Sequence, residues 1–207
     1  MSAPLKPAAQ RGVALITALV MLLVLSIMAV AGARLAINSK RMASNQRDRD
    51  LAVQAAEMAL QDAEMDIQGV VAVNSRSALF SGSNPNLLPF VAGCNTGTTP
   101  GAAFQGLCAA VDSGTPNWET VDFAQTGANA RAVAYGTFTG RQFPTAPTGL
   151  LPAALPRYII EPIQDTSPGA SGSPDAPVVY IFRVTAMGFG ANTATRVMLQ
   201  SYYRKAE

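Results

Sequence analysis

One stretch of the chain constrains its fold more than any other: residues 13–33 carry no charge and are apolar except for Thr17 and Ser26. An α-helix rises about 1.5 Å per residue, so this run forms a rod about 30 Å long, which matches the hydrocarbon thickness of a bilayer. A buried core helix is the alternative, but such helices are usually shorter and carry a polar stripe. We therefore predict a membrane-spanning helix over residues 13–33.

A secretory signal peptide is a second interpretation of this run, because Ala31, Gly32 and Ala33 form an A-x-A site at its end and basic residues precede it. The apolar core of a signal peptide spans about 7 to 15 residues, which is shorter than this run. Basic residues lie on both sides, so the positive-inside count does not settle the orientation. Cleavage after Ala33 therefore stays open as an alternative to a retained anchor.

Helical sequence continues beyond the apolar run, because no proline occurs between Ala8 and Asn84. We predict one helix from about Val13 to about Asp66, with Gly69 as its stop. Its second part, residues 34–68, is amphipathic. The predicted apolar face is centred on Leu51, Ala55, Met58 and Met65 and widened by Ala52, Ala56, Ala59, Leu60, Ala63 and Ile67. The alternating charges of residues 47–50 are interpreted as a solvated helix surface.

Residues 69–131 are rich in Gly, Ser, Thr, Asn and Pro, which indicates loops and short elements. Both cysteines of the chain, Cys94 and Cys108, lie in this region. In a reducing compartment they would be two ordinary thiols, whereas in the periplasm a disulfide between them would contribute about 3 kcal/mol. The disulfide is the favoured interpretation.

The last part of the chain, residues 132–207, reads as a sheet. Segments 132–138, 157–163, 178–187 and 195–204 are rich in Val, Ile, Tyr, Phe and Thr and are separated by turn residues. We expect an antiparallel meander of about four strands whose third strand turns one face to the core: Val178, Tyr180, Phe182, Val184 and Ala186. Packing the amphipathic helix on this sheet satisfies both apolar faces, so the predicted fold class is α+β.

The composition argues against several functions. The chain has 15 Lys and Arg against 13 Asp and Glu, and this net charge of +2 gives no electrostatic footprint for nucleic acid. Histidine is absent, which removes the usual general base and the usual zinc ligand. Asp165 and Asp175 lie on a polar loop, but their spacing fits no defined calcium loop. We expect no enzyme, no cofactor and no metal site.

The order of these segments resembles a type IV pilin or pseudopilin: a short basic leader ending in Gly12, an apolar run, an amphipathic helix and a sheet. QRGVAL at residues 10–15 and RMASNQRDRDLAVQAAEMALQDAE at residues 41–64 resemble the N-terminal region of the PilX family of minor pilins. PRYIIEPI at 156–163, RVTAMGFG at 183–190 and TRVMLQSYYR at 195–204 are similar to its sheet end. The resemblance covers residues 10–68 and about the last fifty.

The resemblance implies a processing pathway. Residues 1–12 would be a leader that a prepilin peptidase removes after Gly12, and the same enzyme would methylate the new amine of Val13. The helix would then hold the chain in the inner membrane as a single pass, with the C-terminal domain in the periplasm. An assembly platform would transfer it to the pilus, where the helix packs among other minor pilins and the major pilin. Roles in cell adhesion and twitching motility are implied in the same way.

One position departs from the family pattern. Most pilins carry Glu at mature position five, and here that position is Thr17. We expect the Thr17 hydroxyl to bond to the carbonyl of Val13 on its own helix. Such a subunit fits a site with no subunit above it, so we predict a priming complex at the pilus tip with other minor pilins and a PilY-type adhesin. The alternatives are a tip pseudopilin of a type II secretion system and a soluble periplasmic binding domain released after Ala33.

Overall fold

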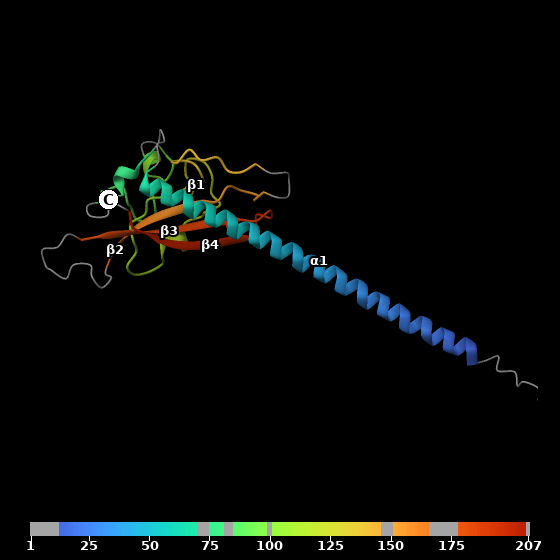
Figure 1. The fold of residues 1–207 in the computed structure, drawn as a ribbon. Helices are drawn as coiled ribbons and strands as arrows, with labels where there is room; N and C mark the ends of the chain where they lie inside the picture. Colours follow the sequence, from blue (N-terminus) through green and yellow to red (C-terminus); the bar gives the residue numbers. More distant parts are fainter. Residues whose placement is uncertain are drawn as a thin grey trace, which may run out of the picture. The chain divides into compact units, whose positions relative to one another are not determined.

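The computed structural model describes residues 13–69, 75–80, 85–98, 101–145, 151–165 and 178–205. The chain divides into two units, Met1–Gln46 and Arg47–Glu207. The described elements, in chain order, are helix α1 (Val13–Gln68), 3-10 turns η1 (Ser77–Leu79) and η2 (Gly101–Phe104), helix α2 (Asn117–Thr120) and strands β1 (Val133–Ala134), β2 (Arg157–Gln164), β3 (Tyr180–Phe189) and β4 (Arg196–Tyr203) (Figure 1).

Helix α1 confirms the predicted long helix and ends where the sequence places its stop. Gly69 follows the last helical residue with φ of +99°, a left-handed conformation that glycine adopts without a steric penalty. Its N–H donates to the carbonyl of Met65 at 2.9 Å, which satisfies one carbonyl of the last turn. A side chain at this position would also meet Ser77, so both backbone angle and space favour glycine.

The four strands form one antiparallel sheet in the order β1-β2-β3-β4, which confirms the predicted meander. Strands β2 and β3 pair from Arg157 opposite Met187 to Gln164 opposite Tyr180. The first strand is much shorter than the predicted 132–138. Gly136 adopts φ of +80° and the chain turns there, since the N–H of Thr137 donates to the carbonyl of Ala134.

The main core lies between α1 and one face of the sheet. Phe182, Val184 and Ala186 of β3 are fully buried there, as predicted. The outer end of the predicted face is wrong, because Tyr180 is only half-buried and Val178 is 50% exposed. The helix contributes mostly small side chains to this core: Ala52, Ala55, Ala56, Ala59, Ala63 and Ile67, together with Asp62 and Asp66.

The large residues predicted at the centre of the buried face of α1 do not lie at that centre. Met65 is exposed, and Leu51 and Met58 are half-buried. Gly188 of β3 gives the reason, since a Cβ there would collide with the carbonyl oxygen of Ala52 and the backbone nitrogen of Ala56. The backbones of strand and helix approach so closely that large side chains are displaced from the contact and alanines fill it.

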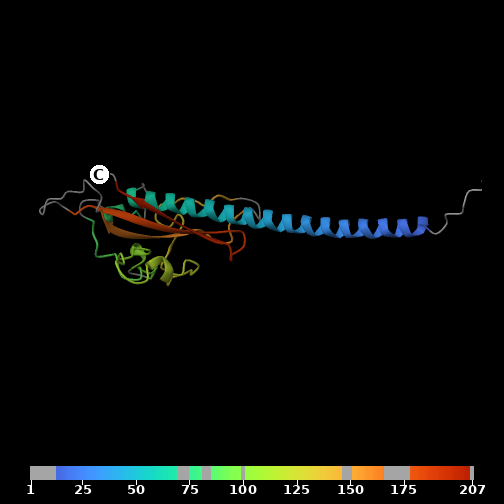
Figure 2. The same ribbon diagram turned by 90° about the horizontal axis from the view of Figure 1, so that it is seen from below.

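Part of the loop-rich region forms a layer on the opposite face of the sheet from α1 (Figure 2), while Phe80, Phe90 and Leu107 contribute to the main core. A second core cluster lies under this layer: Cys94, Cys108, Val121, Phe123, Ala132, Ile159 and Phe189. Thr185, which the sequence assigns to the face away from the main core, is also fully buried. The sheet is thus covered on both faces, and the sequence does not predict this third layer.

Candidate functional site

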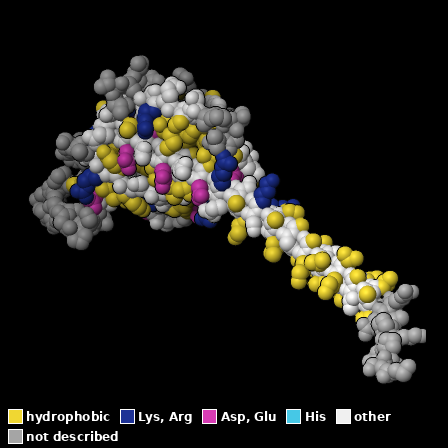
Figure 3. All heavy atoms as spheres, turned by 45° about the vertical axis from the view of Figure 1, so that its right-hand side comes forward, with side chains coloured by type: hydrophobic (Ala, Val, Ile, Leu, Met, Phe, Trp, Pro, Cys, Tyr) yellow, Lys and Arg dark blue, Asp and Glu magenta, His cyan; other side chains and the backbone are white. Residues whose placement is uncertain are grey.

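The first half of α1 is an apolar rod. Every residue from Val13 to Arg47 is exposed, and hydrophobic side chains dominate the surface of this segment (Figure 3). Its most apolar 18-residue window has a mean hydropathy of 2.9 and none of it is buried. Among the described residues, α1 is the one helix that is long enough and apolar enough to cross a membrane. The pattern indicates a segment that lipid or partner helices cover.

Thr17 and Ser26, the two polar side chains of residues 13–33, bond to their own helix. The Thr17 hydroxyl lies 3.1 Å from the carbonyl oxygen of Val13 and 3.0 Å from that of Ala14, which confirms the predicted bond to Val13. The Ser26 hydroxyl reaches the carbonyls of Leu22 and Leu23 at 2.8 and 2.9 Å. Both hydroxyls can therefore leave water without an unsatisfied donor.

The second half of α1 is fastened to the sheet by buried carboxylates, of which Asp66 is the most connected. Its side chain is fully buried and accepts hydrogen bonds from Nε and Nη2 of Arg76 at 3.0 and 2.7 Å. The hydroxyl of Tyr158 on β2 donates to the same carboxylate at 3.0 Å. One carboxylate thus joins the helix, the segment after it and the sheet.

Arg76 extends this network into the loop region. Its Nη1 donates to the carbonyl of Gln105 at 2.6 Å, and its guanidinium lies over the Phe138 ring, 3.6 Å from the centroid. Burial raises the pKa of Tyr158 well above its ordinary value, so the hydroxyl stays protonated and donates at any physiological pH. Removing either charge would leave the other buried and uncompensated, which typically costs about 3–5 kcal/mol.

Asp62, one helical turn before Asp66, is a second buried attachment. It accepts hydrogen bonds from the backbone N–H of Gly136 at 2.8 Å and from the hydroxyl of Thr139. Burial raises the pKa of Asp62, and these two hydrogen bonds oppose the shift only in part. The carboxylate holds the turn after β1 against the helix.

Asp48 is a third attachment, at the start of the globular unit. Asp48 accepts a hydrogen bond from the backbone N–H of Asn192 at 3.1 Å. The hydrogen bond from the Thr195 hydroxyl lowers the pKa of Asp48 most, and the backbone N–H groups of Asn192 and Ala191 lower it further. The interpretation of residues 47–50 as a solvated surface is therefore wrong for Asp48. It caps the turn that joins β3 to β4.

The sequence analysis missed these three aspartates as functional positions. Asp62 and Asp66 are four residues apart and continue the stripe of Ala52, Ala55 and Ala59, so helical spacing places them on the buried face. Two carboxylates on an apolar stripe indicate buried acceptors that need donors from elsewhere. The donors to Asp62 and Asp66 lie far away in the sequence, and Tyr158 is 92 residues from Asp66. No local sequence pattern connects these donors to the two carboxylates.

The other face of the sheet carries its own buried ion pair. Glu161 of β2 is fully buried and accepts hydrogen bonds from Nε of Arg183 at 3.0 Å and from the side-chain amide of Asn117 at 2.8 Å. The Arg183 guanidinium lies 4.3 Å from the centroid of the Trp118 ring. These contacts attach helix α2 and the loop layer to β2 and β3.

Cys94 and Cys108 form a disulfide within the loop layer. Reciprocal backbone bonds accompany it: the N–H of Asn95 donates to the carbonyl of Leu107, and the N–H of Gly106 donates to that of Asn95, both at 3.1 Å. Further along, the N–H of Cys108 donates to the carbonyl of Ile160 at 3.0 Å, so the closed loop is attached to the edge of β2.

The predicted cleavage site and the two carboxylates of the polar loop remain. Gly12 lies outside the described residues, and Val13 is the first residue of α1. Asp165 pairs with Arg204, and Asp175 lies outside the described residues. Within the part of the chain that the structure describes, no group of three or more Cys, Asp or Glu side chains could hold a metal ion.

Two protein-family models match the amino-acid sequence of the chain. Residues 11–61 match the PilX N-terminal model, and residues 104–205 match the model of the type IV pilus assembly protein PilX C-terminal region. The chain belongs to the PilX family. No curated protein and no solved structure matches it.

Membership of the PilX family makes the chain a minor pilin of the type IV pilus, and the family consists of structural subunits. The N-terminal match covers the apolar half of α1 and ends one residue before Asp62. The C-terminal match includes all four strands of the sheet and Cys108. Asp66 and Arg76 lie between the two matched stretches.

Asp62 predicts a pH-dependent difference between wild type and Asp62→Asn. Because the folded-state pKa lies above the ordinary value of 3.8, the contribution of Asp62 to stability is fully present below that value and is lost as pH rises through the raised pKa. Asn does not titrate and can serve both hydrogen bonds. Stability of Asp62→Asn relative to wild type should therefore rise as pH increases from below 3.8 through the raised pKa of Asp62.

Thermal unfolding of the detergent-solubilised full chain, followed by circular dichroism, measures this difference. Glu57→Gln on the exposed side of α1 is the matched control and should follow wild type across the range. A relative stability of Asp62→Asn that falls as pH rises would contradict the raised pKa.

Proposed function

We propose that this minor pilin takes part in priming type IV pilus assembly, in a tip complex with other minor pilins and a PilY-type adhesin. The observation that carries the proposal is the apolar half of α1, whose side chains are exposed among the residues that the structure describes. A neighbouring pilin helix presents the same kind of apolar surface. Contacts between pilin helices can therefore replace the contacts that each helix makes with lipid. Burying apolar area contributes about 25 cal/mol per Å², offset in part by the cost of association.

Thr17 supports a terminal position in the filament. A Glu at this position would place a charge in an apolar environment and would need a partner charge from a neighbouring subunit. The Thr17 hydroxyl is already satisfied by the carbonyls of Val13 and Ala14 and needs none. A tip pseudopilin of a type II secretion system would share this property, and the two PilX matches favour the pilus.

The proposal includes processing at the start of α1. A prepilin peptidase cuts after Gly12 and methylates the amine of Val13, and the helix then anchors the chain in the inner membrane. The helix is uninterrupted from Val13 to Gln68, so a cut after Gly12 leaves the whole rod attached to the globular unit. The disulfide of Cys94 and Cys108 supports a globular unit in the periplasm, where disulfides persist.

Mass spectrometry of the mature chain tests this processing. The expected N-terminus is Val13 with one methyl group on its amine, and Gly12→Val should retain the leader because the branched side chain obstructs the scissile bond. Gly32→Ala is the matched control, since nothing lies within 4 Å of a Cβ there, and it should be processed as wild type. A mature chain that begins at Arg34 would contradict the proposal and support a signal peptide.

Substitutions at Thr17 test the terminal position. Thr17→Ala should leave the number of pili unchanged, because the hydroxyl bonds only to its own helix. The Thr17→Glu variant should not be incorporated along the shaft of the filament. Pilus counts and immunogold labelling of sheared filaments measure both effects.

Two results would count against the tip. Loss of pili in Thr17→Ala would show that the hydroxyl serves a neighbouring subunit. Labelling of Thr17→Glu along the shaft, with pilus number intact, would show that the rest of the chain fits a position with a subunit above it.

A further inference from the structure

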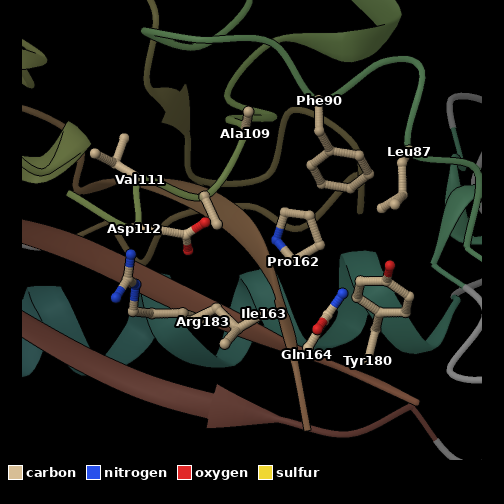
Figure 4. Close-up of a pocket in the computed structure, with 11 residues that line it drawn as sticks. Leu87, Phe90, Ala109, Val111, Asp112, Pro162, Ile163, Gln164, Tyr180 and Arg183 are labelled. Atoms are coloured by element: carbon tan, nitrogen blue, oxygen red, sulfur yellow. The ribbon is translucent and has the colours of Figure 1, made fainter. Parts of the chain in front are cut away.

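A pocket of about 550 Å³ opens beside the outer edge of β2, and its lining residues do not include Asp48, Asp62 or Asp66. Its walls come from the loops at Leu87 and Phe90 and at Val111 and Asp112, and from Pro162 and Arg183. Figure 4 shows the Arg183 guanidinium and the Asp112 carboxylate at one end, and Leu87, Phe90 and Tyr180 at the other. Its volume lies in the range of about 300–1,000 Å³ typical of binding sites.

Arg183 is held ready to donate into this pocket. Its Nε is bonded to the buried carboxylate of Glu161, and its plane lies over the Trp118 ring. Within the described residues, its two terminal nitrogens have no hydrogen-bond partner, while the side chain is only 12% exposed. A fixed, nearly buried guanidinium with two free donors matches the two oxygens of a carboxylate.

Among the described residues, the edge of β2 has no paired neighbour at the same place. The N–H of Ile160 donates to the carbonyl of Gly106 at 2.9 Å, so the even-numbered residues of β2 direct their backbone groups to this edge. Beyond Cys108 the neighbouring segment leaves β2, because the N–H of Ala109 donates to Val91 instead. The carbonyl of Pro162 and the N–H of Gln164 are left without a partner among the described residues.

Next in the chain to the pocket residues Leu87 and Phe90 are exposed aliphatic side chains, and we call Leu87, Leu88 and Val91 the rim. Leu88 is 89% exposed, and its neighbours Leu87 and Val91 are also exposed. Adjacent exposed aliphatic side chains beside an open strand edge are typical of a protein interaction site rather than of a free surface. The rim, the strand edge and the guanidinium thus point to one class of occupant.

We propose that an extended segment of a different polypeptide adds to the edge of β2 here and places a carboxylate, from an acidic side chain or a C-terminus, on Arg183. Main-chain hydrogen bonds to Pro162 and Gln164 supply the strand addition, and Leu87 and Leu88 cover the apolar side chains of the incoming strand. The inference does not depend on the pilus assignment, because this surface lies in the globular unit alone.

Asp112 makes the charge of the occupant testable. It is exposed and lies at the same end of the pocket as Arg183 (Figure 4). An incoming carboxylate would meet repulsion from Asp112, so Asp112→Asn should strengthen binding. An incoming cation would give the opposite result, which makes the sign of this effect diagnostic.

Photo-crosslinking in the native cell tests the proposal on the full-length chain. The probe p-benzoylphenylalanine replaces Leu88 at the rim, and the same probe at exposed Ala191, beyond the other end of β3, is the matched control. The Leu88 probe should form a conjugate with a different polypeptide, and mass spectrometry should map it beside an Asp, a Glu or a C-terminus. The Ala191 probe should not form this conjugate.

Three substitutions then test the chemistry. Conjugate yield should rise about two-fold or more in Asp112→Asn and fall roughly tenfold or more in Arg183→Met. Since Arg183→Met leaves Glu161 buried without its cation, Gln164→Pro is the second variant: it removes one edge donor, keeps the ion pair and should lower the yield as well. The disulfide, read on non-reducing gels, and the circular dichroism spectrum verify the fold of each variant.

Several results would overturn the proposal: no conjugate at Leu88, a conjugate made of two copies of this chain or of lipid, a yield that falls in Asp112→Asn, or a yield that both folded loss variants leave unchanged. None of these results bears on processing at Val13 or on presence in sheared filaments. Failure of this inference and failure of the proposed function are therefore distinguishable.

Discussion

The carboxylate of Asp66 is the constraint on which the rest of the globular unit depends. It is buried on α1 and must have donors, and Arg76 and Tyr158 supply them from the segment after the helix and from β2. Because Arg76 also reaches the carbonyl of Gln105, one charge pair fixes the helix, the sheet and the loop layer in a single arrangement. The alanine contact at Gly188 brings helix and strand close, but an apolar contact of small residues specifies position weakly. The directional bonds of Asp66 supply that specificity.

The two halves of α1 have different contacts, and this difference suits a subunit whose helix and globular unit move together in the proposed assembly. The second half of the helix is attached to the sheet by Asp48, Asp62 and Asp66, whereas the apolar side chains of the first half are exposed among the described residues. The polar attachments keep their partners whether lipid or neighbouring helices surround the first half. In the proposed transfer from membrane to filament, the surroundings of the rod would change without requiring a change in the globular unit.

The sequence predicts the long helix, its stop at Gly69, the four-strand meander and its α+β class, because each depends on local periodicity and turn chemistry. It also places the alanines and Ile67 on the buried face of α1 but misplaces the centre of that face. The large residues Leu51, Met58 and Met65 outweigh alanines whose close contact depends on Gly188, more than a hundred residues later. The role of Asp62 is readable from its spacing, but Gly136 and Thr139 as its donors are not. The loop layer is missed for the same reason: its attachment through Glu161, Asn117 and Arg183 joins distant segments.

A double-mutant cycle at Asp66 and Arg76 tests most directly whether this pair holds the unit together. The full chain in detergent is unfolded by urea as wild type, Asp66→Asn, Arg76→Met and the double variant. The account predicts that Arg76→Met alone costs about 3–5 kcal/mol, because it leaves a buried charge, and that the double variant is more stable than the sum of the single losses by about 2 kcal/mol or more. Losses that add within about 0.5 kcal/mol would contradict it, since they would show that the two side chains stabilise the fold independently.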